Sequence, residues 1–483
     1  MATRRSRRLS PPLMAFLAFL AAMAIGSSCS LFGMDASGRA GPRHVFLFIG
    51  DGMSYGSEVA ASRYLYGADE GLAWHVFPFR AWAATWDASA YDLFAADASA
   101  PVFAEDSFDP LLGYDPARGG DEPWPLGPDA RAYLLRAATD SASAATAIAT
   151  GLKTENGNIA WARGDPAGGA LVTIAESARS RLGSAVGIVS TVPFNHATPA
   201  AFSAHSPRRD SYAGIAAEIL GSTRPDVLVG GGHPAWNATY FSSEALADLK
   251  ASGAWTVVER AAGLDGGDSL AAAAAALGAG GRLFGLFGGG DGAFEAPIPL
   301  DNPGAPAFVA EPENPSLAEA VAAAIDALAR DPDGFLLVAE QGDVDWANHA
   351  NDFPRMLGAI ASLDAAVRTV VDFVDRPGDG IDWGNSLLVV TADHGTGLLR
   401  FDTASAIGKG ALPSSRTGAV YSYPGGTVSY NATSHQNELV GFAARGDAAV
   451  SSFGDLLGAG RPGTRILDNT DIYRGLADFL GLR

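Results

Sequence analysis

The stretch His44–Ser54, HVFLFIGDGMS, joins an apolar run to a turn that carries a carboxylate. Its first seven residues are continuous, apolar and rich in branched and aromatic side chains, which is typical of a strand buried on both faces. Asp51 follows directly, and the flanking Gly50 and Gly52 let the backbone turn tightly. The stretch therefore predicts a buried strand that presents an acidic side chain at its carboxyl end.

Five further runs share this character and alternate with helical patterns. We expect strands at 184–191, 225–232, 334–340, 385–392 and 439–445, and helices at Leu171–Arg181, Ser316–Arg330, Phe353–Asp375 and, rich in Ala, within 269–281. Strands that alternate with helices predict a mostly parallel sheet covered by helices on both faces. The expected fold class is therefore α/β, with one central sheet.

Two regions fall outside this rhythm. Residues 87–128 are acidic, aromatic and rich in Pro and Gly, and we expect an insertion there. Residues from about 400 to 434 show little periodicity, so a small irregular subdomain is expected. We see no internal repeat and no sharp boundary, and residues 43–483 are therefore predicted to form a single domain.

The first 29 residues have the pattern of an export signal. The basic segment MATRRSRR precedes the run PLMAFLAFLAAMAIG, which is too short to span a bilayer comfortably, and residues 30–42 form a predicted linker. Cys29 is the only cysteine, which excludes an intrachain disulfide, and its place after small residues suggests a lipidated bacterial lipoprotein. The alternative is an ordinary signal peptide cut near Ser28. Either way we expect export to the periplasm or the cell surface, with membrane anchoring if Cys29 is lipidated.

The charge balance limits the partners of the chain. Its 483 residues are 48% hydrophobic and 18% charged, and the formal net charge is -20. Such an acidic chain is a poor partner for nucleic acid or for an acidic membrane surface. An anionic substrate would also be repelled overall, so it would need a local cationic site made by metal ions or arginine.

Polar residues gather where the expected strands end, which is where open α/β sheets place their sites. Asp393 and His394 follow one expected strand, and Glu340 ends another. Asp345 and His349 come next at a helical i, i+4 spacing, which brings an Asp and a His to one face, suitable for a single ion. Each residue alone also has a plainer explanation, since Asp often caps a helix and a lone His often only packs.

The grouping of these residues favours a metal site over capping and packing. Of eight histidines in the chain, His349, His394 and His435 all fall in strand-end segments with carboxylates nearby. Carboxylate with imidazole and no thiolate suits zinc at a catalytic site, whereas carboxylates with a hydroxyl suit magnesium. Two neighbouring cations would clamp the attacking and leaving oxygens of a phosphoryl displacement.

The segment 136–157, RAATDSASAATAIATGLKTENG, places Ser141 in the first turn of an Ala-rich helix. Unpaired N–H groups and the positive end of the helix dipole gather there, which suits a nucleophile. On this stretch alone, the alternative is that Asp140 or Ser141 simply caps the helix. Nearby cations would lower the pKa of Ser141, and the metal-ligand pattern therefore favours the nucleophile.

Together these motifs resemble those of the bacterial alkaline phosphatase family. IGDGM, TDSASAATAIATGLKTENG, VPFNHATPAAFSAH, VLVGGG, VAEQGDVDWANHAND and TADHG occur in the family's order between about Val45 and Gly395, with weaker matches at HQNELVGFAARG and LDNTDIYRGLADFLGL. The resemblance implies a metal-dependent phosphomonoesterase that hydrolyses small phosphate esters through a covalent phosphoserine on Ser141.

The resemblance also implies roles for the matching positions. Arg209 would grip the phosphate oxygens, with Arg208 as the fallback if the register is off by one. Two Zn²⁺ and one Mg²⁺ are implied per chain, and their ligands would be Asp51, Asp393 and His394 for the first zinc, Asp345, His349 and His435 for the second, and Asp51, Thr198 and Glu340 for magnesium.

Three positions depart from the usual pattern of the family. His196 stands where some members have Asp near the magnesium, which makes it a further candidate at the metal site. Trp346 stands where others have Lys or His, and Gln436 follows His435 where the family usually has Thr.

Other functions stay open at this point. A phosphodiesterase of the same superfamily should lack the magnesium set, so Thr198 and Glu340 favour monoesters. A sulfatase would need a Cys/Ser-x-Pro-x-Arg motif, which the DSASA segment lacks. A catalytically idle surface lipoprotein that binds phosphate or metal is the alternative from a different class. Many members of the family are homodimers, so a homodimer is also expected.

Overall fold

The computed structural model describes residues 41–120, 130–293, 298–299, 308–309, 312–402 and 407–483. The predicted signal peptide with Cys29, nearly all of the predicted linker, and the end of the predicted insertion at 121–129 lie outside these described residues. His44 to Arg483 form one compact unit. None of the helices in the described ranges is both long and apolar enough to cross a membrane.

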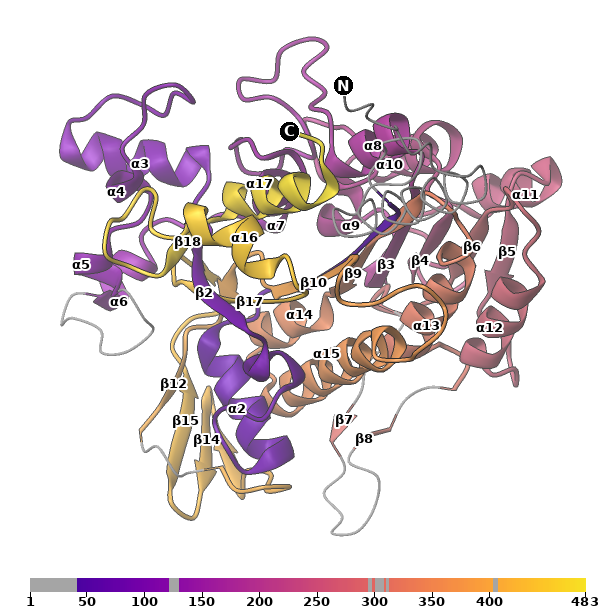
Figure 1. Cartoon of the computed structure of the whole chain (residues 1–483). Helices are drawn as coiled ribbons and strands as arrows, with labels where there is room; N and C mark the ends of the chain where they lie inside the picture. Colours follow the sequence, from indigo (N-terminus) through magenta and orange to yellow (C-terminus); the bar gives the residue numbers. More distant parts are fainter. Residues whose placement is uncertain (1–40, 121–129, 294–297, 300–307, 310–311, 403–406) are drawn as a thin grey trace, which may run out of the picture. The chain divides into compact units, whose positions relative to one another are not determined.

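A ten-stranded sheet forms the centre of the fold (Figure 1). Most neighbouring strands are parallel, among them the pairs β1–β10, β3–β9, β3–β4 and β4–β6. The strand β17 is the exception, because it lies antiparallel to both of its neighbours, β10 and β2. This arrangement confirms the predicted, mostly parallel sheet. The strands, in sheet order, are β18 (Ile466–Asp468), β2 (Phe79–Ala84), β17 (Val440–Arg445), β10 (Ser386–Thr391), β1 (Arg43–Gly50), β9 (Gly334–Gln341), β3 (Ala185–Pro193), β4 (Val227–Gly231), β6 (Leu283–Leu286) and β5 (Thr256–Glu259).

Both faces of the sheet are apolar, which explains why its strands are continuous hydrophobic runs rather than alternating ones. Along β1, Phe46 and Phe48 enter one core, while Val45 and Leu47 enter the other, because successive side chains of a strand point to opposite faces. The first core packs under α2 (Tyr55–Tyr66), α12 (Gly266–Ala276), α13 (Leu317–Leu328) and α15 (Phe353–Val374). The second packs under α7 (Ser141–Thr150), α9 (Ala197–Ala201), α10 (Tyr212–Glu218) and α17 (Asn469–Leu480).

The helix predicted from Leu171 to Arg181 differs from the observed one. It begins only at Ile174, because Thr173 and Glu176 form a capping box there, and α8 (Ile174–Ser177) continues into the π-helical turn η2 (Ala178–Leu182). The other predicted helices agree with α12, α13 and α15 to within a few residues. The remaining helical segments described after β3 are η3 (Ile219–Thr223), α11 (Ser243–Ser252), α14 (Asp343–His349), α16 (Ala449–Phe453) and η4 (Gly454–Leu456).

The predicted insertion is helical where it is described. It contains α3 (Ala88–Ala98), α4 (Pro110–Gly113) and α5 (Pro116–Gly119), is followed by α6 (Ala130–Leu134), and is preceded by η1 (Ala73–Val76). These short helices close over an aromatic cluster that includes Trp86, Tyr91, Phe94, Phe103 and Tyr114. The insertion therefore packs through a separate, largely aromatic cluster, which Leu398, Leu439 and Ile466 of later segments complete.

The subdomain predicted as irregular is more regular than its sequence indicated. It holds a four-stranded antiparallel sheet in the order β12 (Leu399–Phe401), β15 (Gly426–Tyr430), β14 (Val420–Tyr423) and β13 (Ser415–Thr417). Strands of three to five residues are too short to show a clear alternation in the sequence. Two further two-stranded sheets pair β7 (Ile298–Pro299) with β8 (Phe308–Val309), and β11 (Gly395–Thr396) with β16 (His435–Gln436).

His205 contacts a carboxylate in each of two helices, α8 and α10, and makes the stability of the fold depend on pH. Its Nδ1 lies 2.7 Å from Glu218 Oε1 in α10, and its Nε2 lies 3.3 Å from Glu176 Oε2 in α8. Burial lowers the pKa of His205, but the hydrogen bonds and charges of the two carboxylates raise it more, to about 10. Because the folded pKa exceeds the unfolded value, this stabilisation is complete below the unfolded pKa and is lost as the pH rises through about 10.

We therefore expect the free energy of unfolding to fall between the unfolded pKa of histidine and about pH 10, and the His205→Gln variant to show a flatter profile. Solvent screening of the two carboxylates limits the expected effect to about 1–2 kcal/mol. Urea unfolding followed at a series of pH values measures it. A variant whose pH profile keeps the wild-type slope contradicts the prediction.

Candidate functional site

The site residues come together because their strands are neighbours. β10, β1 and β9 lie side by side, and the carboxyl ends of β10 and β1 meet at one edge because the two strands are parallel. Asp51 follows β1, Asp393 and His394 follow β10, Glu340 lies at the end of β9, and α14, which follows β9, carries Asp345. These side chains, predicted at strand ends, thus occupy one region of the molecule.

The first cluster contains Asp51, Asp393 and His394, all of which are buried. His394 Nε2 lies 3.3 Å from Asp393 Oδ2 and 3.6 Å from Asp51 Oδ1. The backbone N–H groups of Gly52 and His394 donate to the other oxygen of Asp393, at 3.1 and 2.9 Å. The backbone therefore orients Asp393 and leaves its Oδ2 facing the cluster. This set is the one that the resemblance assigned to the first zinc.

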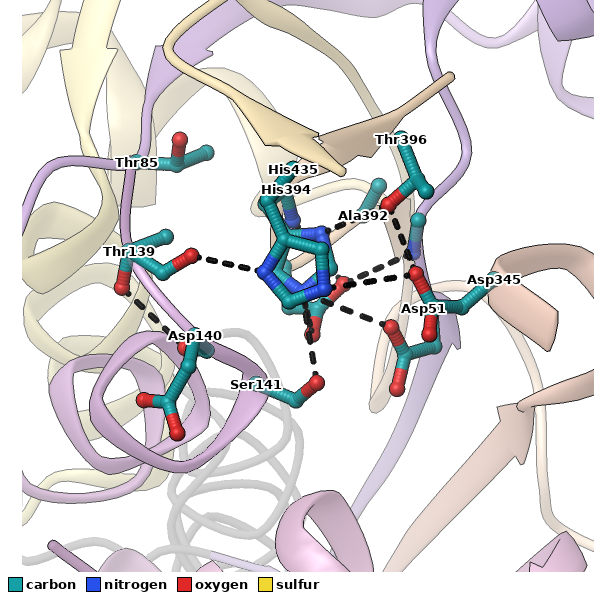
Figure 2. A network of polar contacts seen from close by, with 12 residues as sticks. Asp51, Thr85, Thr139, Asp140, Ser141, Asp345, Ala392, His394, Thr396 and His435 are labelled. Carbon is teal, nitrogen blue, oxygen red and sulfur yellow. Dashed lines mark hydrogen bonds and ion pairs between the residues drawn. The ribbon is translucent and has the colours of Figure 1, made fainter. Parts of the chain in front are cut away.

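The second cluster contains Asp345, His394 and His435. His435 Nε2 lies 3.6 Å from Asp345 Oδ1, and the rings of His394 and His435 stack with centroids 3.7 Å apart (Figure 2). His349 stands at the exposed edge, with Nε2 3.3 Å from Asp345 Oδ2 and 3.0 Å from His435 Nε2. The structure thus gathers the three residues assigned to the second zinc, and it adds His394 to them.

Pairing of two short strands explains the place of His435, the candidate ligand that is followed by Gln436 where the family usually has Thr. β16 pairs with β11, so that His435 lies opposite Thr396, two residues after His394. His435 Nδ1 contacts the backbone oxygen of Thr139 at 2.9 Å, and His349 Nδ1 contacts that of Thr433 at 2.7 Å. Backbone carbonyls that accept from Nδ1 leave Nε2 free as a metal ligand.

A third group surrounds Glu340. Thr198 in α9 and Ser190 in β3 are buried beside it, and the Ser190 hydroxyl donates to Glu340 Oε2. Burial raises the pKa of Glu340 to about 7, although the hydrogen bond from Ser190 acts in the opposite direction. The magnesium set implied by the resemblance is therefore brought together. Ser190 was not anticipated, although its polar hydroxyl at the end of an apolar strand is a signal in the sequence.

The donor set fits bound cations. Asp51 Oδ1, Asp393 Oδ2 and Glu340 Oε1 are buried, and none has a hydrogen-bond partner among the described residues. Burial and the neighbouring carboxylates raise the pKa of Asp51, and that of Asp393 to about 8. Several buried carboxylate oxygens without donors are unfavourable unless positive charge compensates them. The residues present therefore fit metal ions, with oxygen ligands around Glu340 and mixed oxygen and nitrogen ligands around His394.

Ser141 lies in the first turn of α7, beside the first cluster. Its Oγ is 3.2 Å from His394 Nε2 (Figure 2). Asp140 is the N-cap of the helix, and its carboxylate accepts from the backbone N–H of Ser143 at 3.0 Å. The cap is thus Asp140, which leaves the Ser141 hydroxyl free of that task. The cap explanation is thus confirmed for Asp140, and the role of Ser141 as a nucleophile stays a prediction.

The structure also distinguishes the two neighbouring arginines. Arg209 Nη1 donates to Asp140 Oδ2 at 2.9 Å, which holds the guanidinium next to the first turn of α7. Arg208 pairs instead with Asp210, and its side chain is 71% exposed. Arg209 is therefore the arginine at the site, as the register of the sequence motif predicts.

His196 stands apart from the clusters of carboxylates and histidines. Its ring packs edge-on against those of Tyr240 and Trp346, with centroids 6.4 and 5.9 Å away. Burial, with a smaller effect of Arg209, lowers the pKa of His196 to about 3. Its Nδ1 has no hydrogen-bond partner in the described part of the chain. A role of His196 at the metal site stays a prediction.

Fold and site together define an α/β protein in which a serine at a helix N-terminus faces clusters of carboxylates and histidines that fit metal ions. The sequence model of the alkaline phosphatase family matches residues 124–447, which is more than half of the chain. The chain therefore belongs to the alkaline phosphatase family, whose members generally use metal ions.

Individual relatives agree with this assignment. The chain is 32% identical to alkaline phosphatase 3 of Bacillus subtilis over 264 residues, which cover 54% of this chain and 49% of the relative. It is 29% identical to streptomycin-6-phosphate phosphatase of Streptomyces griseus, with 93% of each chain covered. The chain thus spans about half the length of the Bacillus relatives it matches, but nearly all of the Streptomyces one.

Solved structures share the fold. Alkaline phosphatase of Thermus thermophilus superposes with a TM-score of 0.62 at 21% identity, covering 92% of both chains. The enzyme of the Antarctic bacterium TAB5 gives 0.59 at 22% identity, covering 92% of this chain and 99% of the other. These likenesses confirm the predicted α/β architecture over almost the whole described chain.

Proposed function

We propose that this chain is a metal-dependent phosphomonoesterase that works through a phosphoserine on Ser141. The observation that carries the proposal is the position of the Ser141 hydroxyl. It lies 3.2 Å from His394 Nε2, beside the first cluster and in the first turn of α7, while the neighbouring Asp140 accepts a hydrogen bond from Arg209. A candidate nucleophile, a set of candidate cation ligands and a guanidinium thus lie close together.

Three groups of residues would hold the metal ions. We assign Asp51, Asp393 and His394 to one zinc, Asp345, His349 and His435 to a second, and Asp51, Thr198 and Glu340 to magnesium. When bound, such cations supply positive charge that favours the serine alkoxide and neutralises the phosphate oxygens.

The remaining chemistry belongs to side chains and backbone. In the proposed reaction Ser141 Oγ gives its proton to solvent and attacks phosphorus while the ester P–O bond breaks. The leaving oxygen takes up a proton from solvent and departs as the alcohol. The positive end of the α7 dipole stabilises the developing negative charge on Oγ. Water then attacks the phosphoserine, which releases inorganic phosphate and restores the Ser141 hydroxyl.

Arg209 is proposed to bind the phosphate. A guanidinium presents two parallel N–H groups that match two non-bridging phosphate oxygens. Asp140 keeps Arg209 charged and oriented, because burial lowers the pKa of the guanidinium but the charge and hydrogen bond of Asp140 raise it further. An ester with one substituent offers enough free oxygens for this contact and for the cations.

The group around Glu340 favours monoesters over diesters. It adds a third set of cation ligands next to Asp51, and a site with three cations suits the dianionic charge of a monoester better than the single charge of a diester.

The test is turnover by zinc- and magnesium-loaded protein of an aryl phosphate and of the matching aryl methyl phosphate diester. We expect much faster release of the aryl alcohol from the monoester. A brief acid quench followed by intact-mass analysis is expected to show one phosphate adduct on the wild type, trapped best at acid pH where its hydrolysis slows. Faster turnover of the diester would replace this proposal by a phosphodiesterase, and no turnover with metals bound would leave an idle binding protein.

Export, attachment of lipid at Cys29 and formation of a homodimer are further proposals that rest on the sequence alone. The basic and apolar segments before Cys29 support the first two. The intact mass of protein isolated from the membrane fraction, beside a Cys29→Ser variant, tests lipid attachment.

A further inference from the structure

A buried carboxylate lies behind the first turn of α7, outside the metal clusters. Asp87 follows β2, caps α3 of the insertion and is 1% exposed. Its Oδ1 accepts from the backbone N–H of Ala90 at 2.7 Å. Its Oδ2 accepts from the Asn156 side-chain amide at 2.5 Å and from the Ser143 hydroxyl at 2.6 Å. One oxygen of Asp87 thus caps α3 in the insertion, and the other accepts hydrogen bonds from α7 and from the loop that follows α7.

Ser143 connects Asp87 to the residue that holds the arginine. Its Oγ lies 2.6 Å from Asp87 Oδ2 and 2.8 Å from Asp140 Oδ1. Asp140 in turn accepts from the backbone N–H of Gly157 at 3.1 Å and from Arg209 at 2.9 Å. A continuous chain of contacts therefore runs from Asp87 through Ser143 and Asp140 to Arg209.

The number of protons available along this series of hydrogen bonds determines what Asp87 contributes. The Ser143 hydroxyl has one proton and lies between two carboxylates, so it cannot donate to both. If Asp87 carries a proton, it donates to Ser143 and Ser143 donates to Asp140. Burial raises the pKa of Asp87 to about 7, which makes this protonated form accessible near neutral pH. Two other polar groups lie near Asp87 and Ser143. The Thr139 hydroxyl is 2.9 Å from Ser143 Oγ, and the charge of the buried Lys153 lowers the pKa of Asp87.

We propose that Asp87 is a positioning residue for phosphate binding: through the Ser143 hydroxyl it fixes the Asp140 carboxylate that holds Arg209. A bidentate contact between a guanidinium and phosphate depends on the orientation of the guanidinium, so a looser Asp140 weakens binding of phosphate more than it slows the chemistry. The inference rests on the proposed function to the extent that Arg209 binds the phosphate of the substrate.

The experiment compares Asp87→Ala, Ser143→Ala and the double variant in metal-loaded protein. We expect KM for an aryl phosphate and Ki for inorganic phosphate to rise about 3- to 10-fold, which corresponds to the net contribution of one ordinary hydrogen bond. We expect kcat to change less than about 2-fold, because the group that attacks is untouched. The double variant should resemble either single variant, since both break the same link.

Two further variants separate positioning from general damage. Asp87→Asn keeps the shape and can donate to Ser143 permanently once the Asn156 amide turns, so we expect it to restore KM and Ki to near the wild-type values. Thr150→Ala is the matched control, because it removes a buried hydroxyl from the far end of α7, where it donates to Thr146 O at 2.8 Å. Its KM and Ki should stay unchanged.

Several results would overturn the inference. These are wild-type KM and Ki in the two alanine variants, effects of the two variants that add in the double variant, or a loss confined to kcat. If Asp87→Ala does not fold, Ser143→Ala and Asp87→Asn decide alone. Titration of the same proteins with inorganic phosphate in a calorimeter keeps the two proposals apart. Absence of turnover in the wild type contradicts the proposed function, whereas the phosphate affinities of the variants still test the positioning by Asp87.

Discussion

Replacement of Ser141 by alanine is expected to lower kcat for an aryl phosphate by about 1,000-fold or more, which corresponds to about 4 kcal/mol of transition-state free energy. The serine hydroxyl is the group in the first turn of α7 that faces His394, and alanine removes it without changing the buried methylene. Direct attack by water is left as the remaining route, without the geometry that a fixed oxygen provides.

Steady-state turnover and the acid-quench mass of Ser141→Ala measure this effect. Metal content should stay at the wild-type level, because the carboxylates and histidines of the clusters are intact, and this separates loss of the nucleophile from loss of the ions. Thr150→Ala in the same helix serves as the control for helix damage. Turnover within 10-fold of the wild type, or a phosphate adduct on the variant, would falsify the assignment of Ser141 as nucleophile.

Replacement of Asp51 by asparagine is expected to remove at least one metal ion per chain and to lower activity by about 100-fold or more, more than is typical for a change outside the ligand shell. Asp51 is shared: its carboxylate takes part in the first cluster with His394 and interacts with Glu340 of the third group. The amide keeps the shape of the side chain but withdraws a negative charge from the site.

Metal analysis after extensive dialysis, together with turnover at increasing zinc and magnesium concentrations, measures the effect of Asp51→Asn. Added metal should restore part of the activity, because a weaker site fills by mass action. Asp69→Asn is a matched control, since that carboxylate is 54% exposed and pairs with Arg63 away from the clusters. An unchanged metal content in Asp51→Asn would remove Asp51 from the ligand sets.

Much of the fold could be predicted from the sequence, because hydrophobic pattern and strand order depend on local properties. Fully buried strands such as β1 and β9 are unbroken apolar runs, and the helices between them have clear periodicity. The start of α8 was wrong by three residues, because the capping box of Thr173 and Glu176 outweighs the apolar residues before it. The antiparallel direction of β17 follows from which neighbours it pairs with, which no local pattern indicates.

For the site too, some features could be predicted from the sequence and others depend on the tertiary structure. The sequence by itself determined which chemical groups are present and on which strand ends they lie: Asp51, Asp393 and His394 follow buried strands, and Ser141 opens a helix. Only the tertiary structure decided how these groups combine. His394 belongs to two clusters because β16 pairs with β11, and Ser143 lies between two carboxylates because the insertion brings Asp87 to α7. The reason is physical: a side chain's type is set along the chain, but its neighbours are set by strand pairing and packing between segments that are far apart in the sequence, such as Asp87 and Ser143, which are separated by 56 residues.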